Sequence, residues 1–303
     1  MANVFVIGDL NIDLHCHVKK LPSRGEEVHS DSMSLSIGGN AANFAVTMGR
    51  LGVQPEFYSC TGNDALSGFL KRELESAGVR PVLKDVDKNN GFTIATVFRS
   101  GERRFISNKG ASGMLNVKDL KPIIEKLGTG DIVYIGGFFH LHGLVKGFPG
   151  FLSACRKKGA TTMFDFTFHE KGGFSLFKDF ARYLDMVFLN EDELRRLGSA
   201  NVRGSGRMSR LGVRDVIVKL GKRGSLFYTN GMLTRAPAVK AKAVDTTGAG
   251  DVFNAAFVYG FMNGMLPEQC LRLGNWVAGY KISRTGIEVP ERDKFHAFLK
   301  KLE

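Results

Sequence analysis

The sequence predicts an α/β protein with a mostly parallel central sheet, helices on both faces of that sheet, and a small second sheet. Short apolar runs alternate along the chain with stretches of helical periodicity, which is typical of a parallel sheet covered by helices. The first run, "NVFVIGDLNID", is continuously apolar up to Gly8, as expected of a strand buried on both faces. Two polar, β-rich stretches indicate the separate, more exposed sheet.

Further strands and helices of the central sheet are predicted along the rest of the chain. Further apolar runs predict strands, namely "PEFYSC", "DIVYIGG", "ATTMFDF", "DMVFLN" and "DVIVKLG", and helical periodicity covers residues 65–77, 117–127 and 141–158. Sheets of this kind bind ligands outside the carboxyl ends of their strands. We therefore expect the site among the polar residues after these runs, which are residues 9–13, Asp165, residues 190–193 and residues 221–224.

The second sheet is predicted from two segments. Residues 18–37 are polar and alternating and contain Pro22 and Gly25, which favours short antiparallel strands exposed on one side. Residues 92–107 predict a hairpin that turns at Ser100 and Gly101. We expect residues 13–36 and 89–107 to form one small sheet, and residues 1–12, 37–88 and 108–303 to form the large domain.

Composition excludes several classes of protein. Of 303 residues, 43% are hydrophobic and 24% charged, the balance of an ordinary globular protein. We find no apolar run that could cross a bilayer and no basic leader, so we expect a cytoplasmic protein without a membrane partner. The net charge of +12 is scattered in short groups without a nucleic-acid-binding motif, so we expect it to attract anionic nucleotides rather than nucleic acid.

The segment "AVDTTGAGDVFNAAF" (residues 243–257) carries the clearest chemical signal. Gly248, Ala249 and Gly250 precede a helical stretch, and a small-residue helix start exposes backbone N–H groups that can cradle phosphate oxygens. Asp251 follows within the first turn, where its carboxylate could accept a proton from an alcohol. A carboxylate there also stabilises any helix, so the ordinary structural role stands beside the catalytic one.

The segment "SIGGNAANFAVTMGRLG" has the same organisation near the other end of the chain. Gly38 and Gly39 permit close backbone approach, and Asn43 lies in the first turn of the following helix. Its amide can donate to and accept from hydroxyl groups. Alternatively, the small residues only let the helix pack tightly on the sheet.

Together these two segments resemble the ribokinase-like, or phosphofructokinase-B type, family of carbohydrate and nucleoside kinases. That family carries a glycine pair followed by an Asn near its N-terminus and a DTxGAGD stretch near its C-terminus, which match Gly38, Gly39, Asn43 and residues 245–251. The resemblance covers essentially the whole chain. It implies a three-layer sandwich with a β-sheet lid and transfer of the γ-phosphoryl group of ATP to a hydroxyl of a small sugar. No GxxxxGK[ST] loop occurs, which excludes the P-loop kinases.

The resemblance also implies roles for individual residues. Asp251 is expected to be the catalytic base, and Gly248, Ala249 and Gly250 are expected to form the anion hole. Substrate hydroxyls are expected to contact Asn11, Asp13, Gly38, Gly39 and Asn43.

On the nucleotide side, the loop "KLGKRGS" matches a segment that meets the ATP phosphates. The residues expected to bind ATP are Asn190, Lys219, Gly221, Gly224 and Asn275. Glu193, in "LNEDE", is expected to organise Mg²⁺ through water, although Asn190 and Glu193 also fit a helix cap with its capping-box partner. Asp245 and Thr247, with residues 281–288, match the positions at which the family can bind a monovalent cation such as K⁺.

The acceptor is left open by two departures from ribokinase, which has a Lys at the position of Asn40 and a Glu where this chain has "GGFFHLHG". Phe138, Phe139 and His140 could stack on a nucleoside base or belong to the core. Arg103 and Arg104 could clamp a sugar acid such as 2-keto-3-deoxygluconate or be solvated turn charges. A non-catalytic binding protein is a third hypothesis, against which the intact Asp251 argues. Paired lids in relatives make a homodimer a further expectation.

Overall fold

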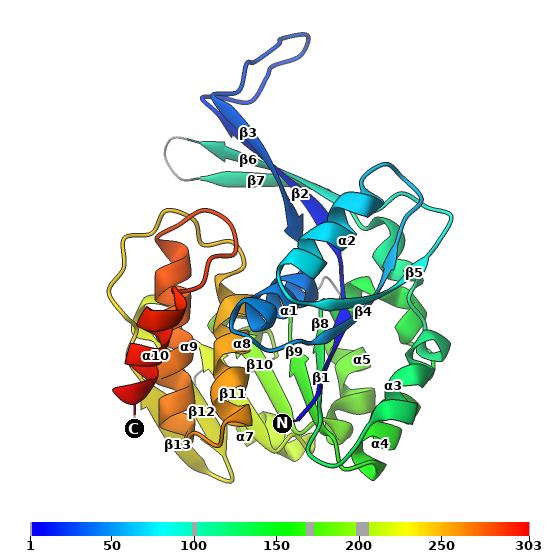
Figure 1. The fold of residues 1–303 in the computed structure, drawn as a ribbon, viewed down its shortest axis with the longest axis vertical. Helices are drawn as coiled ribbons and strands as arrows, with labels where there is room; N and C mark the ends of the chain where they lie inside the picture. The colour runs from blue at the N-terminus through cyan, green and yellow to red at the C-terminus, as the bar shows by residue number, and fades with distance from the viewer. Residues whose placement is uncertain (1, 99–101, 168–172, 198–205, 303) are drawn as a thin grey trace.

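The computed structural model of the chain describes residues 2–98, 102–167, 173–197 and 206–302. In these ranges the main sheet has nine strands in the order β13-β12-β11-β10-β9-β8-β1-β4-β5 (Figure 1). All neighbours from β11 to β5 run parallel, whereas β12 and β13 are antiparallel. The strands are β1 Val4–Gly8, β4 Glu56–Thr61, β5 Arg80–Asp85, β8 Ile132–Gly136, β9 Thr161–Asp165, β10 Met186–Asn190, β11 Asp215–Lys219, β12 Ser225–Thr229 and β13 Met232–Ala236.

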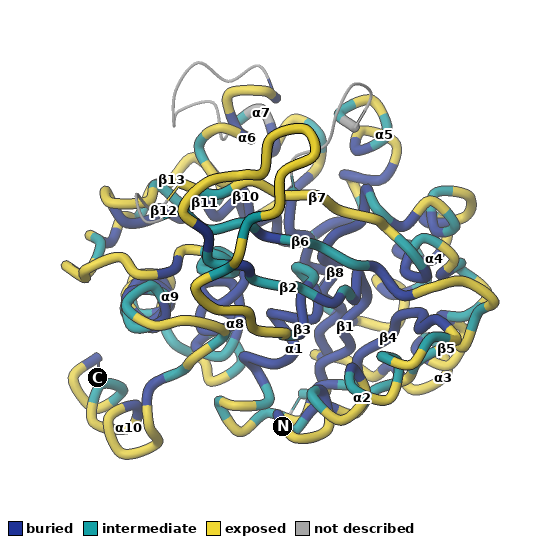
Figure 2. Tube along the Cα trace, turned by 90° about the horizontal axis from the view of Figure 1, so that it is seen from above, coloured by how far each residue is buried: buried dark blue, intermediate teal, exposed yellow. Residues whose placement is uncertain are grey.

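Helices cover both faces of this sheet, as the continuously apolar strands predicted. Phe5 and Ile7 of β1 pack with one set of helices, and Val4 and Val6 pack with the other. The first set is α3 Lys121–Lys126, α4 Phe148–Lys157, α5 Gly173–Phe180, α6 Glu191–Arg196 and α7 Gly206–Arg210, and the second is α1 Asn40–Arg50, α2 Ser67–Ser76, α8 Ala249–Met262 and α9 Pro267–Ile282. Helix α10, Arg292–Lys300, packs outside α8 and α9. The predicted three-layer α/β class is confirmed, and Figure 2 shows the buried strands at its centre.

A second sheet of four strands stands off the main body in the order β3-β2-β6-β7 (Figure 1). Its strands are β2 Asn11–Val18, β3 Ser32–Gly38, β6 Gly91–Phe98 and β7 Arg103–Asn108. The two segments predicted to pair do so, but the central pair β2 and β6 runs parallel, so the sheet is mixed.

Residues 18–37 were predicted to contain short antiparallel strands, and β3, which pairs antiparallel with β2, is one of them. The first apolar run supplies both β1 and β2, and residues 19–31 form no strand. The predicted turn at Ser100 and Gly101 lies outside the described residues.

Small residues bring the beginning of α1 against the central strands. A Cβ on Gly8 would lie 2.1 Å from the Cβ of Ala41, and a Cβ on Gly136 would lie 3.2 Å from the same atom. The run of alanines that follows the glycine pair is buried in the same interface. This close contact, which only small residues permit, places the first turn of α1 at the carboxyl ends of β1 and β8.

Two further features of the described residues concern the chain as a whole. Among the described residues, no helix has both the length and the apolar character that crossing a membrane requires. The four cysteines are buried free thiols.

Candidate active site

The two glycine-containing segments meet at the carboxyl edge of the sheet. Asn43, in the first turn of α1, donates from Nδ2 to Oδ2 of Asp251 at 2.8 Å, and Asn40 Nδ2 lies 3.3 Å from Oδ1 of the same carboxyl. Asp251 lies in the first turn of α8 and is buried. The fold thus joins residues 208 positions apart in the sequence. Both amides hold the Asp251 carboxyl in one orientation.

The surroundings of Asp251 make it a stronger base than a solvated carboxylate. Burial and the neighbouring Asp165 carboxylate raise its pKa well above the usual range, although the Asn43 hydrogen bond and Lys219 act in the opposite direction. A buried carboxyl with a raised pKa is suited to accepting a proton from an alcohol.

The residues predicted to form an anion hole lie at the beginning of α8. Gly248 is the N-cap residue with a φ of 71°, and a Cβ there would lie 2.6 Å from Cδ1 of Ile287. A Cβ on Gly250 would lie 3.3 Å from Nζ of Lys219. Gly250 therefore lies beside an ammonium group at the positive end of the helix dipole, an arrangement that favours a bound anion.

Lys219, the last residue of β11, is held there by an ion pair. Its Nζ lies 3.0 Å from Oδ1 of Asp165, which ends β9. Burial alone would lower the pKa of Lys219, but Asp165, Glu193 and Asp251 reverse this, so its pKa is raised. The ammonium consequently stays charged beside the start of α8.

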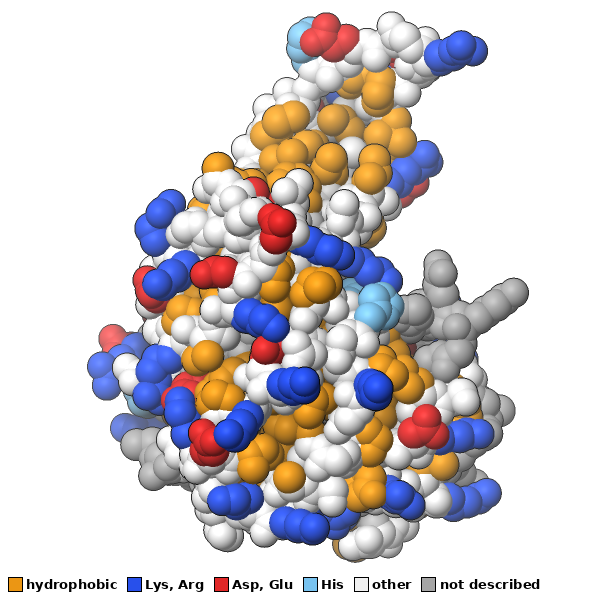
Figure 3. All heavy atoms as spheres, turned by 90° about the vertical axis from the view of Figure 1, so that its right-hand side faces the viewer, with side chains coloured by type: hydrophobic (Ala, Val, Ile, Leu, Met, Phe, Trp, Pro, Cys, Tyr) orange, Lys and Arg blue, Asp and Glu red, His pale blue; other side chains and the backbone are white. Residues whose placement is uncertain are grey.

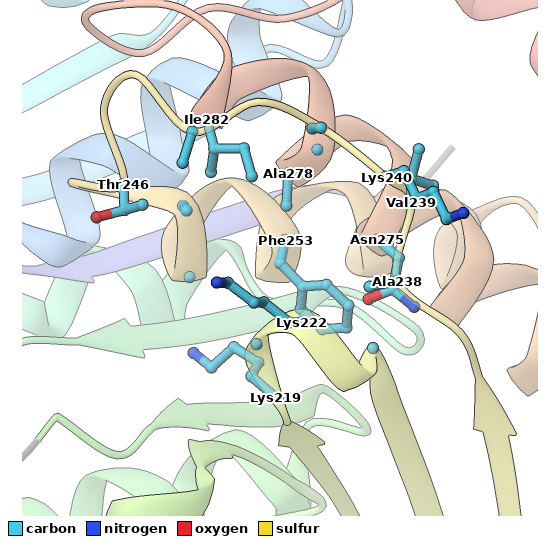
Figure 4. Close-up of a pocket in the computed structure, with 17 residues that line it drawn as sticks. Lys219, Lys222, Ala238, Val239, Lys240, Thr246, Phe253, Asn275, Ala278 and Ile282 are labelled. Carbon is cyan, nitrogen blue, oxygen red and sulfur yellow. The ribbon is translucent and has the colours of Figure 1, made fainter.

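A cavity of about 520 Å³ opens on this corner (Figure 4). Lys219, Lys222 and Thr246 lie toward its end at the beginning of α8, whereas Val239 and Asn275 lie toward the opposite end (Figure 4). The apolar side chains that line it are those of Ala238, Val239, Ala241, Ala243, Ala249, Phe253, Ala278 and Ile282. The cavity thus combines an anion-attracting end with an apolar remainder.

Of the residues predicted to bind ATP, four line this cavity: Lys219, Gly221, Gly224 and Asn275. The Asn275 amide donates to the carbonyls of Ala236 and Pro237 at 3.2 and 3.0 Å, so it fixes the chain that leaves β13.

Asn190 is not among the lining residues. It caps α6: its Oδ1 accepts from the N–H of Glu193 at 2.9 Å, and Glu193 Oε2 accepts from the N–H of Asn190 at 2.7 Å. The capping box is therefore present, with Glu193 buried close enough to Lys219 to influence its pKa.

The predicted substrate residues gather where β2 leaves the main body. Asn11 pairs across to Gly38 and Gly91, and Asp13 lies two residues further along β2. A Cβ on Gly38 would lie 2.2 Å from Oδ2 of Asp13, and a Cβ on Gly91 would lie 2.1 Å from Oδ1 of Asn11. Each polar side chain therefore lies over a glycine. Burial, together with repulsion from Asp9, raises the pKa of Asp13 to about 6, although a hydrogen bond from Thr93 opposes this.

Asp9 lies in the segment 9–13 that was expected to contain the site but was given no role of its own, and Gly91 was not predicted. Asp9 is buried, and its Oδ1 accepts from the N–H of Ala41 at 3.0 Å, which caps α1. Its Oδ2 lies 3.9 Å from Nδ1 of His140. Burial raises the pKa of Asp9 despite these contacts. The position of Asp9 directly after a buried strand was the one signal in the sequence.

The aromatic pair after β8 belongs to the core. Phe138 and Phe139 are 1% and 5% exposed and pack edge to face with Phe164 and with each other. Neither ring has an open face for a nucleoside base.

Arg103 and Arg104 have different surroundings. Arg103 of β7 lies 2.8 Å from Oδ1 of Asp245 and donates to the hydroxyl of Thr247. Arg104 is exposed at the surface, over the ring of Phe98. The Arg103 guanidinium therefore joins the small sheet to the loop before α8.

Residues 1–294 match the pfkB family of carbohydrate kinases, and the chain belongs to that family. It is therefore an ATP-using phosphotransferase with an alcohol acceptor, as its two motifs predicted. The chain is similar to ribokinase from Lactococcus lactis subsp. lactis, with 27% identity covering 100% of this chain and 99% of that protein. It is also similar to 2-dehydro-3-deoxygluconokinase from Haemophilus influenzae, with 28% identity covering 83% and 87%.

Solved structures agree with this assignment. The ribokinase of Thermotoga maritima superposes with a TM-score of 0.83 at 29% identity, covering 99% of this chain and 100% of that one. The ribokinase of Arabidopsis thaliana, solved with ribose and ATP, gives a TM-score of 0.84 at 25% identity and covers 99% of both chains. The fold is thus ribokinase-like throughout.

Proposed function

We propose that this chain transfers the γ-phosphoryl group of Mg²⁺-bound ATP to a hydroxyl of a small sugar, with Asp251 as the base. The observation that carries the proposal is the buried Asp251 carboxyl, oriented by Asn43 and placed in the first turn of α8 beside Lys219. A proton acceptor and an anion-binding helix start lie within one turn of each other. Phosphoryl transfer to an alcohol needs both groups at one point.

ATP fits the cavity with its phosphates toward the beginning of α8. Gly250 and Lys219 supply a backbone N–H and an ammonium at that end, and Gly221 and Gly224 line the loop after β11. Ala238 and Val239 supply apolar surface suited to a base at the other end.

The acidic groups near Lys219 fit a magnesium ion. Asp165 and Glu193 both lie close enough to raise the pKa of Lys219, and Mg²⁺ in phosphate sites takes few carboxylate contacts and keeps several waters. Glu193 would hold the ion through water, consistent with its capping contacts. When bound, Mg²⁺ would neutralise charge on the phosphate oxygens.

The transfer itself is performed by residues of this chain. The Asp251 carboxylate accepts the proton as the sugar oxygen forms a bond to the γ-phosphorus, and the bond from that phosphorus to the β-γ bridging oxygen breaks. Lys219 and the backbone N–H groups at the start of α8 stabilise charge on the transferring group. ADP, a sugar phosphate and the proton on Asp251 result, and that proton leaves to solvent.

The sugar is held where β2 begins. The ionised Asp13 accepts hydrogen bonds from hydroxyl groups, and the Asn11 and Asn43 amides can donate or accept. Gly38 and Gly39 keep this surface free of side chains. The small sheet, joined to the loop before α8 by Arg103, acts as a lid that excludes water from the reaction.

The outer face of the small sheet supports a homodimer. Cross-strand register aligns one apolar row over all four strands: Leu35, Leu14, Ile94 and Ile106. Alternation puts this row on the face opposite Asp13 and Arg103, and Ile106 is 71% exposed. Figure 3 shows apolar side chains gathered on this arm. Sedimentation equilibrium is expected to show a dimer that Ile106→Lys dissociates, and a wild-type monomer at micromolar concentration would contradict it.

A coupled ADP-release assay tests the proposed activity. With ATP and Mg²⁺, a panel of pentoses, hexoses, sugar acids and nucleosides is compared with an acceptor-free reaction. We expect saturable turnover with a sugar, and Asp293→Asn, which changes an exposed carboxyl on α10, should behave as wild type. Turnover with nucleosides or sugar acids alone would move the acceptor to that class. ADP release that no acceptor increases would contradict the proposal.

A further inference from the structure

The oxygens predicted to bind a monovalent cation already bind an ammonium group of this chain. Lys281, in the last turn of α9, donates from Nζ to the backbone carbonyl of Asp245 at 2.8 Å and lies 2.9 Å from its Oδ2. The lysine side chain is 0% exposed. Its charged end therefore lies inside the loop that leads to α8, where the family resemblance predicted K⁺.

A potassium ion does not fit beside this ammonium. The second carboxylate oxygen of Asp245 accepts from the N–H of Thr247 at 2.9 Å and contacts Arg103 at 2.8 Å, while the N–H of Gly286 lies 3.3 Å from Oδ2. Both oxygens of Asp245 are thus surrounded by donors, and two of these donors carry positive charge. A third positive charge would meet repulsion from both, and neither carboxylate oxygen of Asp245 is left free to balance it.

We infer that Lys281 replaces the monovalent cation, so that this kinase needs neither K⁺ nor Na⁺ for full activity. An ammonium carries the charge of a potassium ion in a similar volume, and the three donors of Lys281 suit the same carbonyl and carboxylate oxygens. The predicted effect on activity rests on the proposed function, because residues 245–248 lead directly to the proposed anion hole.

Lys281 acts as a positioning residue. Its two contacts fix Asp245. The Asp245 carboxylate in turn accepts a hydrogen bond from the N–H of Thr247, the residue before Gly248. Although burial opposes ionisation, the hydrogen bond and charge of Lys281 help to lower the pKa of Asp245 to about 2. The chain from Asp245 to Gly248 therefore keeps one conformation without an external ion.

Activity in defined salts provides the first test. Wild-type kcat/KM for ATP is expected to be the same in potassium and in tetramethylammonium chloride at equal ionic strength. Lys281→Ala removes the ammonium and leaves space, so it should lose activity in tetramethylammonium by about 5- to 150-fold, the usual range for an effector coupled to a site. K⁺ or NH₄⁺ should restore it. Lys294→Ala removes an exposed lysine of α10 and should show neither effect.

Thermal unfolding of the protein without substrates provides a test that needs no turnover. The wild-type Tm is expected to be identical in the two salts, whereas the Tm of Lys281→Ala should rise with K⁺ concentration as a binding site is created. A wild-type enzyme that K⁺ activates or stabilises, beyond the effect of tetramethylammonium, would overturn the inference even if Lys281→Ala failed to fold. Salt-independent melting with no kinase activity on any acceptor would instead overturn the proposed function alone.

Discussion

Replacing Asp13 by Asn should stabilise the protein while impairing sugar binding. Burial and the Asp9 carboxylate raise the pKa of Asp13 from 3.8 to about 6. The folded protein therefore holds a proton at Asp13 more tightly than the unfolded chain, and stability falls as the pH rises from about 4 through 6. The difference corresponds to about 3 kcal/mol at about 1.4 kcal/mol per pKa unit. Because Asp13 is only partly buried, we expect a gain of about 1–3 kcal/mol at pH 7.5.

Urea unfolding of the Asp13→Asn variant measures this gain. The gain should shrink as the pH is lowered from 7.5 to 4.5, since the wild-type carboxyl then becomes protonated in the folded state. Asp293→Asn, at an exposed position on α10, is the matched control. The KM for the sugar should rise by about 10- to 150-fold, the value of one hydrogen bond to a charged group. A variant that is less stable than wild type at pH 7.5, or whose gain is independent of pH, would refute this reasoning.

Three further predictions concern the nucleotide, the backbone and the metal. Lys219→Met should raise the KM for ATP by about 10-fold or more in steady-state titrations, because it removes the ammonium beside Gly250. Lys222→Met, which changes an exposed lysine, should raise this KM less, and equal effects of the two variants would argue against a phosphate-binding role of Lys219. Gly39→Ala should lower the free energy of unfolding by about 2 kcal/mol or more, because its Cβ would lie 2.5 Å from the Asp9 carbonyl at a φ of 105°. Gly52→Ala, with a φ of 89° and open space around the new Cβ, should lower it by about 1–2 kcal/mol, and the reverse order in chemical unfolding would contradict the packing. Glu193→Gln keeps an acceptor for the capping box, so the Tm of the variant should stay near that of wild type. The Mg²⁺ concentration for half-maximal activity should rise severalfold, and an unchanged Mg²⁺ requirement would show that Glu193 does not hold the metal.

The architecture could be predicted from the sequence because each strand and helix carries its own local pattern. A continuously apolar run such as Val4–Gly8 reports burial on both faces, and glycines before an apolar helix report a crowded helix start. The resemblance then located Asp251 and Lys219 in one family pattern. The contact between Asn43 and Asp251, by contrast, depends on the fold bringing α1 and α8 together.

Other features of the site depend on distant partners and left little trace in the sequence. Asn11 lies over Gly91 and Asp13 over Gly38 through strand pairing, which no local pattern specifies. The parallel pairing of β2 with β6 was missed for the same reason. Lys281 was predicted only as part of the segment 281–288 matched to a cation site, and its complete burial against Asp245 has no local signal in the sequence.

The central claim is that Asp251 accepts the proton of the sugar hydroxyl during transfer. Asp251→Asn has nearly the same shape and can keep contacts with Asn43, so it isolates the loss of the base. Single-turnover phosphoryl transfer, measured beside calorimetric binding of ATP and sugar, is the direct test. The account predicts that transfer slows by about 100- to 10,000-fold while both ligands still bind. Transfer at the wild-type rate in that variant would contradict it.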